Sequence, residues 1–341
     1  MKYRAYIGTY SVRASLGIYL IEADIAAGSI KILNSWQANS PAFLAVHEKI
    51  LYSVLESGGY GGIASWAISD DGSLSQLSVR QTGGTSSCHV CASPDGKKIF
   101  VSNYGDGTLS VFDSNNGVLG EPKLYAHSGH GPNPVRQKGP HVHCSQIDPR
   151  SGRLCVVDLG IDRAVFYNIE DLTIEEIAAE KISAGSLITE PGSGPRHIVF
   201  SRTSSYAWLV CELSSEVYAF NVNNGQRIGV YSTLPADCSV ESYCAAIKLS
   251  PDEKYLYASN RGHDSIACFK INPAAGALSL SAVIPSGGRS PRDFAFTVDG
   301  AFCLAANQDS DNIIVFKMEN GLPAATNLRL EIPSPVCVLF V

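Results

Sequence analysis

The chain has 341 residues, of which 45% are hydrophobic and 17% are charged, and its formal net charge is −6. A negative chain without a basic stripe cannot displace counterions from phosphates, so we predict no nucleic-acid partner. The sequence has no apolar stretch of about 18 residues and no apolar segment after Met1, which predicts neither a membrane span nor a signal peptide.

Short apolar runs that end in a polar residue recur along the whole chain. Their end residues follow one another at intervals of 47 to 55 residues, which is typical of an array of similar supersecondary units. The seven runs end at Thr9, Glu56, Asn103, Asp158, Glu212, Asn260 and Asn307.

Each repeat contains four candidate strands, as the fifth copy shows best. Its runs at 196–201, 207–212, 216–222 and 227–233 are rich in Val, Ile, Tyr and Phe, and Gly, Asn, Asp and Ser separate them. Seven four-stranded antiparallel sheets at this period predict an all-β, seven-bladed β-propeller that forms a single domain over residues 1–341.

The two ends of the chain predict how the ring closes. The first copy starts at a second strand, AYIGT (5–9), whereas PVCVLFV (335–341) resembles an inner strand with nothing after it. The C-terminal strand should therefore join the N-terminal blade and remove a sheet edge. Inner strands are then predicted to start at 41, 87, 142, 195, 244, 291 and 335.

Ten cysteines are spread along the chain, most of them inside predicted strands, where a free thiol packs as a small hydrophobic group. The one CxxC pair, Cys88 and Cys91, lies in a predicted inner strand without the βαβ context of a redox motif. These cysteines favour packing roles in a reducing compartment, so we predict a cytoplasmic protein.

Charged residues gather at equivalent positions of the repeats. Aligning the inner strands places His143, Arg196 and Arg292 at one position, where the other copies carry Ala42, Cys88, Ala245 and Val336. Glu56, Asp158 and Glu212 end second strands, and Arg261 follows Asn260 at the same level. Because inner strands line the channel of a propeller, we expect these charges at one mouth of it.

Two interpretations of this ring of charges stay open. Arg and Glu side chains could simply neutralise each other and plug the channel. Alternatively, the arginines bind an anionic ligand, with His143 and Glu212 available for proton transfer. A protein-binding platform is a further possibility, and it would carry apolar and aromatic residues on this face instead of the Arg and His cluster.

The loop HSGHGPNPVRQKGPHVH (127–143) lengthens one repeat and favours the ligand-binding interpretation. Its histidines, His127, His130, His141 and His143, lack a nearby carboxylate or thiolate at metal-ligand spacing, so we predict no metal site. For His127 and His130 we expect hydrogen bonds that order the loop.

Several segments together resemble a known family, the bacterial 6-phosphogluconolactonases of the seven-bladed lactonase type. They are the loop at 127–143 with VVDLGIDRAVFY (156–167), PGSGPRHIVF (191–200) with CEL (211–213), and LSPDEKYLYASNRGHDSIACF (249–269). The resemblance runs through all seven repeats. It implies hydrolysis of 6-phospho-D-glucono-1,5-lactone in the oxidative pentose phosphate pathway without a required cofactor.

The fungal carboxy-cis,cis-muconate cyclases share the fold of this family, and their proposed site is a His, two Arg and a Glu. Carried over motif by motif, these residues fall on His143, Arg196, Arg261 and Glu212, which we expect to be catalytic. We expect the substrate to be bound by Arg292, His141, His197, Arg136 and Lys138.

The resemblance and the repeat alignment together predict lactone hydrolysis by an activated water. Either Glu212 or His143 takes the water proton, and an arginine stabilises the oxyanion. The sequence has no serine in a GxSxG context, so it does not favour a route through an acyl-enzyme. A cyclase acting on a tricarboxylate and a non-enzymatic scaffold remain the alternatives, and the sequence leaves the oligomeric state open.

Overall fold

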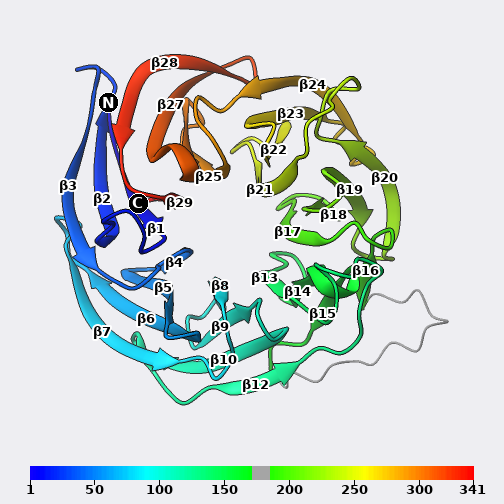
Figure 1. The fold of residues 1–341 in the computed structure, drawn as a ribbon, viewed down its shortest axis with the longest axis horizontal. Coiled ribbons are helices and arrows are strands. Elements are labelled where there is room, and N and C mark those ends of the chain that lie inside the picture. The colour runs from blue at the N-terminus through cyan, green and yellow to red at the C-terminus, as the bar shows by residue number, and fades with distance from the viewer. Residues whose placement is uncertain (171–184) are drawn as a thin grey trace.

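Seven antiparallel β-sheets surround a central axis in the computed structural model, which describes residues 1–170 and 185–341 (Figure 1). Within each sheet the strands follow chain order from the axis outward, apart from the sheet that contains both chain ends. The predicted seven-bladed β-propeller is therefore confirmed. In the described part of the chain, no helix is long and apolar enough to cross a membrane.

The strands of blades 1 to 4, from the axis outward, have the following bounds. Blade 1 is β29 (Pro335–Phe340), β1 (Lys2–Thr9), β2 (Gly17–Asp24) and β3 (Ser29–Gln37). Blade 2 is β4 (Leu44–His47), β5 (Ile50–Ser57), β6 (Tyr60–Ile68) and β7 (Leu74–Gln81). Blade 3 is β8 (Ser87–Ala92), β9 (Lys98–Asn103), β10 (Thr108–Asn115), β11 (Val118–Leu119) and β12 (Lys123–Ala126). Blade 4 is β13 (Val142–Ile147), β14 (Leu154–Asp158), β15 (Arg163–Tyr167) and β16 (Ser186–Ile188).

Blades 5 to 7 repeat the same order. Blade 5 is β17 (Pro195–Phe200), β18 (Tyr206–Cys211), β19 (Glu216–Asn221) and β20 (Gln226–Ser232). Blade 6 is β21 (Tyr243–Leu249), β22 (Tyr255–Arg261), β23 (Ser265–Ile271) and β24 (Leu278–Pro285). Blade 7 is β25 (Pro291–Phe296), β26 (Phe302–Asn307), β27 (Asn312–Glu319) and β28 (Leu322–Glu331). Two short 3-10 turns, η1 (Leu159–Ile161) and η2 (Gln308–Ser310), follow β14 and β26.

Blades 2 and 3 depart slightly from the predicted pattern. In blade 3 the outer strand is divided, because both β11 and β12 pair with β10. In blade 2 the inner strand begins at Leu44 and not at residue 41, although the Val54 amide still donates to the Phe43 carbonyl at 3.1 Å.

The last strand closes the ring as the chain ends predicted. β29 runs antiparallel to β1, with a register from Ala5 opposite Phe340 to Thr9 opposite Pro335. The N- and C-terminal segments consequently lie side by side in the first blade (Figure 1). This pairing leaves β1 with a partner on both sides, so blade 1 has the same four-stranded order as the other blades and the edge of β1 is covered.

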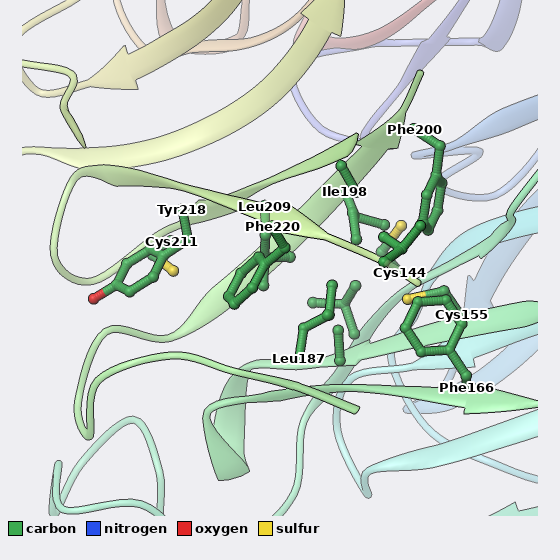
Figure 2. Close-up of a cluster of buried hydrophobic side chains, with 14 residues drawn as sticks. Cys144, Cys155, Phe166, Leu187, Ile198, Phe200, Leu209, Cys211, Tyr218 and Phe220 are labelled. Carbon is green, nitrogen blue, oxygen red and sulfur yellow. The ribbon is translucent and has the colours of Figure 1, made fainter. Parts of the chain in front are cut away.

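Seven clusters of buried hydrophobic side chains hold neighbouring blades together, one at each of the seven blade interfaces. Figure 2 shows the cluster between blades 4 and 5, where Cys144, Phe166 and Leu187 of one blade face Ile198, Leu209 and Phe220 of the next. All ten cysteines lie in the described residues without a disulfide, and seven of them are buried. Most of the thiols therefore serve as packing groups, as the sequence suggested.

Buried aromatic side chains add hydrogen bonds between blades. The hydroxyl of Tyr6 donates to the carbonyl of Gly72 at 2.6 Å, and the hydroxyl of Tyr257 donates to that of Gly321 at 2.9 Å. Trp208, which is 1% exposed, donates from Nε1 to the carbonyl of Gly276 at 2.9 Å. Each bond joins a second strand to a turn of the following blade, which satisfies a polar atom that packing would otherwise bury alone.

A chain that ends at Pro333 should lose the closing strand, so we expect it to expose the inner edge of β1 and to aggregate. The measurement is the soluble fraction and the thermal unfolding midpoint. Removal of Val341 alone, an exposed residue outside β29, is the matched control. A shortened chain that stayed as soluble as the intact protein and kept its midpoint would contradict this role of β29.

Candidate active site

β-Bulges place one ring of side chains around the axis. The ladder between the first and second strand shifts register near the start of the inner strand in six of the seven blades. A bulge leaves an extra residue and re-aims its side chain. The shifted segments contain Cys88, His143, Arg196, Ala245, Arg292 and Val336, which are the residues that the repeat alignment had placed together.

A second ring comes from residues at the ends of the second strands, and here the sequence alignment placed Glu212 wrongly by one position. β18 ends at Cys211, which pairs with Glu216 just as Asn103 pairs with Thr108. Glu212 is therefore equivalent to Tyr104 and not to Asn103. In five blades the amide of this residue donates to a carbonyl just before the inner strand or at its first residues: Tyr10 to Ser334, Tyr104 to Ser86, Leu159 to His141, Glu212 to Gly194 and Gln308 to Ser290.

Asp158 consequently does not belong to the ring of charges at the channel. Its side chain is fully buried and accepts from the amides of His141 and Gly160, each at 2.8 Å. His127 Nδ1 lies 2.7 Å from Asp158 Oδ2, and its Nε2 lies 2.6 Å from the hydroxyl of Tyr167. His127 thus orders the loop, as expected. His130 is exposed, and its Nδ1 lies 3.3 Å from the carbonyl of the adjacent Gly131.

The two rings enclose a cavity of about 380 Å³ at one mouth of the channel. Its cationic wall contains Arg136, Arg261 and Arg292, beside His143 and Glu212. The remaining lining residues come from blades 1 to 3: Tyr10, Ser40, Ala42, Glu56, Ser86, Ser87, Cys88 and Tyr104. Arg196 does not line this cavity. It lines a small adjoining cavity of about 20 Å³, together with His143 and Arg292.

Glu212 is the common ion-pair partner of three arginines. Its Oε1 lies 2.6 Å from Arg136 Nη2, and its Oε2 lies 3.1 Å from Arg261 Nη2 and 3.2 Å from Arg196 Nε. Burial raises the pKa of the Glu212 carboxyl, but the surrounding guanidinium charges outweigh it and hold the pKa far below its ordinary value. The side chain is therefore a carboxylate at every physiological pH.

Arg196 is held rigidly, being 3% exposed. Its Nη1 donates to the carbonyl of Ala245 at 2.7 Å and lies 3.2 Å from Nε2 of His197. The Nε–H is near Glu212 but is not aligned for a hydrogen bond, so this buried donor has no acceptor among the described residues. Burial and the like charges of Arg292 and Arg261 lower the pKa of Arg196 to about 10, so it remains a cation at neutral pH.

His143 is a neutral imidazole in this environment. Burial and the charge of Arg196 lower its pKa well below the ordinary value of a histidine, although Glu212 opposes them. Its Nδ1 lies 3.9 Å from the Sγ of Cys88, and its Nε2 makes no hydrogen bond with any described residue. The ring packs edge-on against those of Tyr104 and His197, with centroids 5.6 and 5.3 Å apart.

Arg292 and Arg136 face the cavity in different ways. Arg292 lies over the ring of Tyr10 at 5.1 Å and donates to Oε1 of Gln308 at 3.3 Å, and it forms no ion pair within the described residues. It is thus a cation still able to pair with a ligand. Arg136 reaches in from the long loop, where it bonds the hydroxyl of Tyr104 at 3.2 Å as well as Glu212.

One buried carboxylate fixes the loop that carries Arg136. Asp162, which is 5% exposed, accepts at Oδ1 from Gln137 Nε2 and from the amide of Gly194, and at Oδ2 from the amide of Gly192, each at 2.8 Å. Gly194 lies two residues before Arg196, and its carbonyl accepts from the amide of Glu212 at 2.7 Å. Asp162 therefore orients both the long loop and the start of β17.

Three residues expected to bind a ligand lie elsewhere. Lys138 is exposed and is not among the residues that line the cavity that Arg136 enters. The ring of His141 stacks on that of Tyr104, with centroids 4.4 Å apart, and its Nδ1–H donates to the carbonyl of Tyr104 at 2.7 Å, so His141 supports the wall from behind. His197 does not line the 380 Å³ cavity; it lies against Arg196 in the small adjoining cavity and also lines a separate cavity together with Phe43 and Lys248.

Sequence reasoning missed four residues that build the site: Tyr10, Tyr104, Gln137 and Asp162. A signal existed for the two tyrosines, since each directly follows the polar end of a second strand, as Arg261 does. No comparable pattern marked Gln137 or Asp162, whose roles depend on the loop conformation. Among the described residues, no group of three His, Cys, Asp or Glu side chains has the geometry of a metal site.

The arrangement combines fixed positive charge with a neutral base. Several guanidinium groups can bind an anion or stabilise a developing oxyanion, because their positions are already held by Glu212 and backbone carbonyls. An imidazole with a free nitrogen can accept a proton from a bound water. The site thus suits the addition of water to an anionic carbonyl substrate.

Comparisons with known proteins cover the whole length of the chain. A family model described as "Lactonase, 7-bladed beta-propeller" matches residues 4–340. The 6-phosphogluconolactonase of Bacillus subtilis is 34% identical over 100% of this chain and 99% of its own length. A 6-phosphogluconolactonase of Formosa agariphila is 32% identical over 92% of each chain.

Two solved structures agree closely with this one. The periplasmic gluconolactonase PpgL of Pseudomonas aeruginosa superposes with a TM-score of 0.91 at 30% identity and covers 100% of this chain and 99% of its own. A protein from Lactobacillus plantarum gives a TM-score of 0.91 at 33% identity and covers 100% of both chains.

We expect Asp162→Ala to lower the free energy of unfolding by about 3 kcal/mol, because it leaves two buried donors, Gln137 Nε2 and the amide of Gly194, and the half-buried amide of Gly192 without their acceptor. Hydrogen exchange at the amides of Gly192 and Gly194 should become faster in the same variant. Chemical denaturation and exchange mass spectrometry measure both effects. Asp70→Ala is the control, since that carboxylate is 92% exposed and pairs only with Lys49. Equal losses in the two variants would contradict a special role of Asp162.

Proposed function

The chain belongs to the seven-bladed β-propeller lactonase family, and from this premise we propose that it hydrolyses 6-phospho-D-glucono-1,5-lactone to 6-phosphogluconate. Relatives that carry the name 6-phosphogluconolactonase support this substrate. The observation that carries the proposal is the convergence of Arg136, Arg261 and Arg292 on one cavity beside the neutral imidazole of His143, with Arg196 in the small adjoining cavity that His143 and Arg292 also line.

The substrate presents two groups that need positive charge, a phosphate and a lactone carbonyl. Arg292, which has no ion-pair partner among the described residues, suits the phosphate, and Arg136 at the rim suits it as a second ligand. Arg196 and Arg261 suit the carbonyl, because each has a buried Nε–H without an acceptor in the described chain. A donor left unpaired in the free enzyme gains a partner only when the oxyanion forms.

We assign the base to His143. A water oxygen attacks C1 of the lactone while its proton passes to the free Nε2, and the carbonyl oxygen becomes an oxyanion facing the arginines. The C1–O5 bond then breaks, and the proton on His143 moves to O5, which becomes the hydroxyl of the open chain. Every step uses side chains and water, so no cofactor is part of this proposal.

Glu212 acts as the counter-ion that holds the arginines. Both of its oxygens face guanidinium groups, and its strongly lowered pKa makes it a weak proton acceptor. His143 also has a lowered pKa, but an anionic substrate nearby raises the pKa of an imidazole and so strengthens it as a base.

We also propose that the protein works in the cytoplasm. Unpaired cysteines throughout the described blades suit the reducing cytoplasm, where the oxidative pentose phosphate pathway operates. The P. aeruginosa neighbour is described as periplasmic, so fold alone does not decide this point.

The decisive experiment follows freshly made 6-phosphogluconolactone by NMR with and without the protein. We expect loss of the lactone well above its spontaneous rate. A cyclase of the carboxy-muconate type would instead act on a tricarboxylate, and a scaffold would act on neither compound. Loss of the phosphorylated lactone at the rate seen in buffer would refute the proposal.

Arg196→Ala should lower kcat/KM by about a hundredfold or more, which corresponds to roughly 2.7 kcal/mol of transition-state stabilisation. Arg196→Lys should recover little of it, because an ammonium group cannot reproduce the guanidinium geometry. Steady-state kinetics on the phosphorylated lactone measure both variants. Arg289→Ala, at an exposed arginine outside the cavity, serves as the control. Near-normal turnover by Arg196→Ala would remove this residue from the mechanism.

The pH profile separates the two candidate bases. Protonation of the base abolishes activity as the pH falls, and the lowered pKa of His143 puts this acid limb of kcat/KM below pH 6.5, with a plateau above it. His143→Asn should lower kcat/KM by about a hundredfold and remove the limb. Glu212→Gln should keep the limb but shift it to lower pH, since Glu212 raises the pKa of His143. Loss of the limb in Glu212→Gln alone would make Glu212 the base.

A further inference from the structure

The positively charged side chains of the site lie on one side of the cavity, and the other side carries hydroxyl groups and a carboxylate. Its arginines come from blades 5 to 7 and from the loop that precedes blade 4. The lining residues of blades 1 to 3 include no Lys or Arg among the described residues, and they offer hydroxyl groups and one carboxylate, that of Glu56. The blue and cyan blades that supply this wall lie across the central axis from the green-to-orange blades that supply most of the arginines (Figure 1).

Glu56 differs from Glu212 in having no partner. It lies near the end of β5, opposite Gly61 of β6, and lines the same cavity, but the described chain gives its carboxylate neither an ion pair nor a hydrogen bond. Its backbone amide donates to the carbonyl of Asn39 at 3.0 Å. A carboxylate has about four acceptor positions, all of which remain open to a ligand.

Serine residues line the same cavity as this carboxylate. Ser86 lines the cavity with a backbone φ of +53°, and Ser40 does so with a φ of +50°. The left-handed conformation is costly for residues other than glycine and persists only where the surroundings impose it. The hydroxyl of Ser86 has no hydrogen-bond partner in the described residues, so it too is available to a ligand.

We propose that Glu56 and Ser86 form a hydroxyl-binding subsite, which receives the sugar hydroxyls of the lactone while the opposite wall receives its phosphate and carbonyl. This inference rests on the proposed function and extends it to substrate selection. A carboxylate that accepts from hydroxyl groups forms strong, short hydrogen bonds. A site built to bind hydroxyls also rejects analogues that lack them.

The same carboxylate selects against acidic substrates. A second or third carboxylate on a ligand would lie against Glu56 without a cation to neutralise it, and an unpaired like charge lowers affinity for the wrong partner. The subsite therefore separates a polyhydroxylated lactone phosphate from a polycarboxylate such as a cyclase would bind, although the arginines attract both.

Binding measurements test the subsite without depending on turnover. Glucose 6-phosphate carries ring hydroxyls and a phosphate, whereas inorganic phosphate carries only the anion. In titration calorimetry, Glu56→Ala should weaken binding of glucose 6-phosphate about 10- to 100-fold and change binding of inorganic phosphate by less than about twofold. Glu56→Gln, which preserves the shape, should bind the tricarboxylate tricarballylate more tightly than the parent protein does.

The outcomes separate the subsite from the proposed function. Glu121→Gln, at a carboxylate that is 89% exposed and outside the cavity, should match the parent protein in every titration. Equal weakening of both phosphates in Glu56→Ala, or no preference of the parent protein for glucose 6-phosphate, would overturn the subsite. A protein that showed the expected titrations but did not hydrolyse the phosphorylated lactone would keep the subsite and refute the proposed reaction.

Discussion

The pairing of β29 with β1 is the constraint on which the rest of the structure depends. Guanidinium groups repel one another, and no single blade holds more than one of the cavity arginines. They converge only because the closed ring fixes the distance from every inner strand to the axis. Seven buried hydrophobic interfaces maintain this ring, so the hydrophobic effect opposes the charge repulsion at its centre.

Glu212 offsets part of the repulsion between the guanidinium groups. It positions the arginines more than it stabilises the fold. Burying charges carries a desolvation cost that ion pairing only partly offsets, so an apolar plug would stabilise the ring as well or better. The arrangement is instead suited to binding. One carboxylate neutralises one of several arginines, which leaves the cavity with a positive potential and with donors already in position.

The repeat period predicted nearly all of the fold, because strand length, turn residues and closure are local or periodic properties. The site was harder to predict. The alignment found the bulged positions of His143, Arg196 and Arg292, which share a strand register, but it misplaced Glu212 by one residue because β18 ends earlier relative to its polar residue. Side-chain direction within the long loop decides between Arg136 and Lys138, and it depends on the contact of Gln137 with Asp162, which no local pattern encodes.

The two rings also explain how this scaffold can change its ligand without changing its core. Ala42, Cys88 and Val336 stand at or near the positions that hold His143, Arg196 and Arg292 in other blades, and they leave the space that the cavity occupies. Their backbone pairing does not depend on the side chain, since a bulge directs that side chain toward the axis in any case. A charge gained or lost at such a position alters the potential of the cavity, whereas the interfaces between blades stay as they are. The division between a cationic wall and a hydroxyl-bearing wall is therefore a property of a few side chains, and a change at these positions would alter the ligand without altering the ring itself.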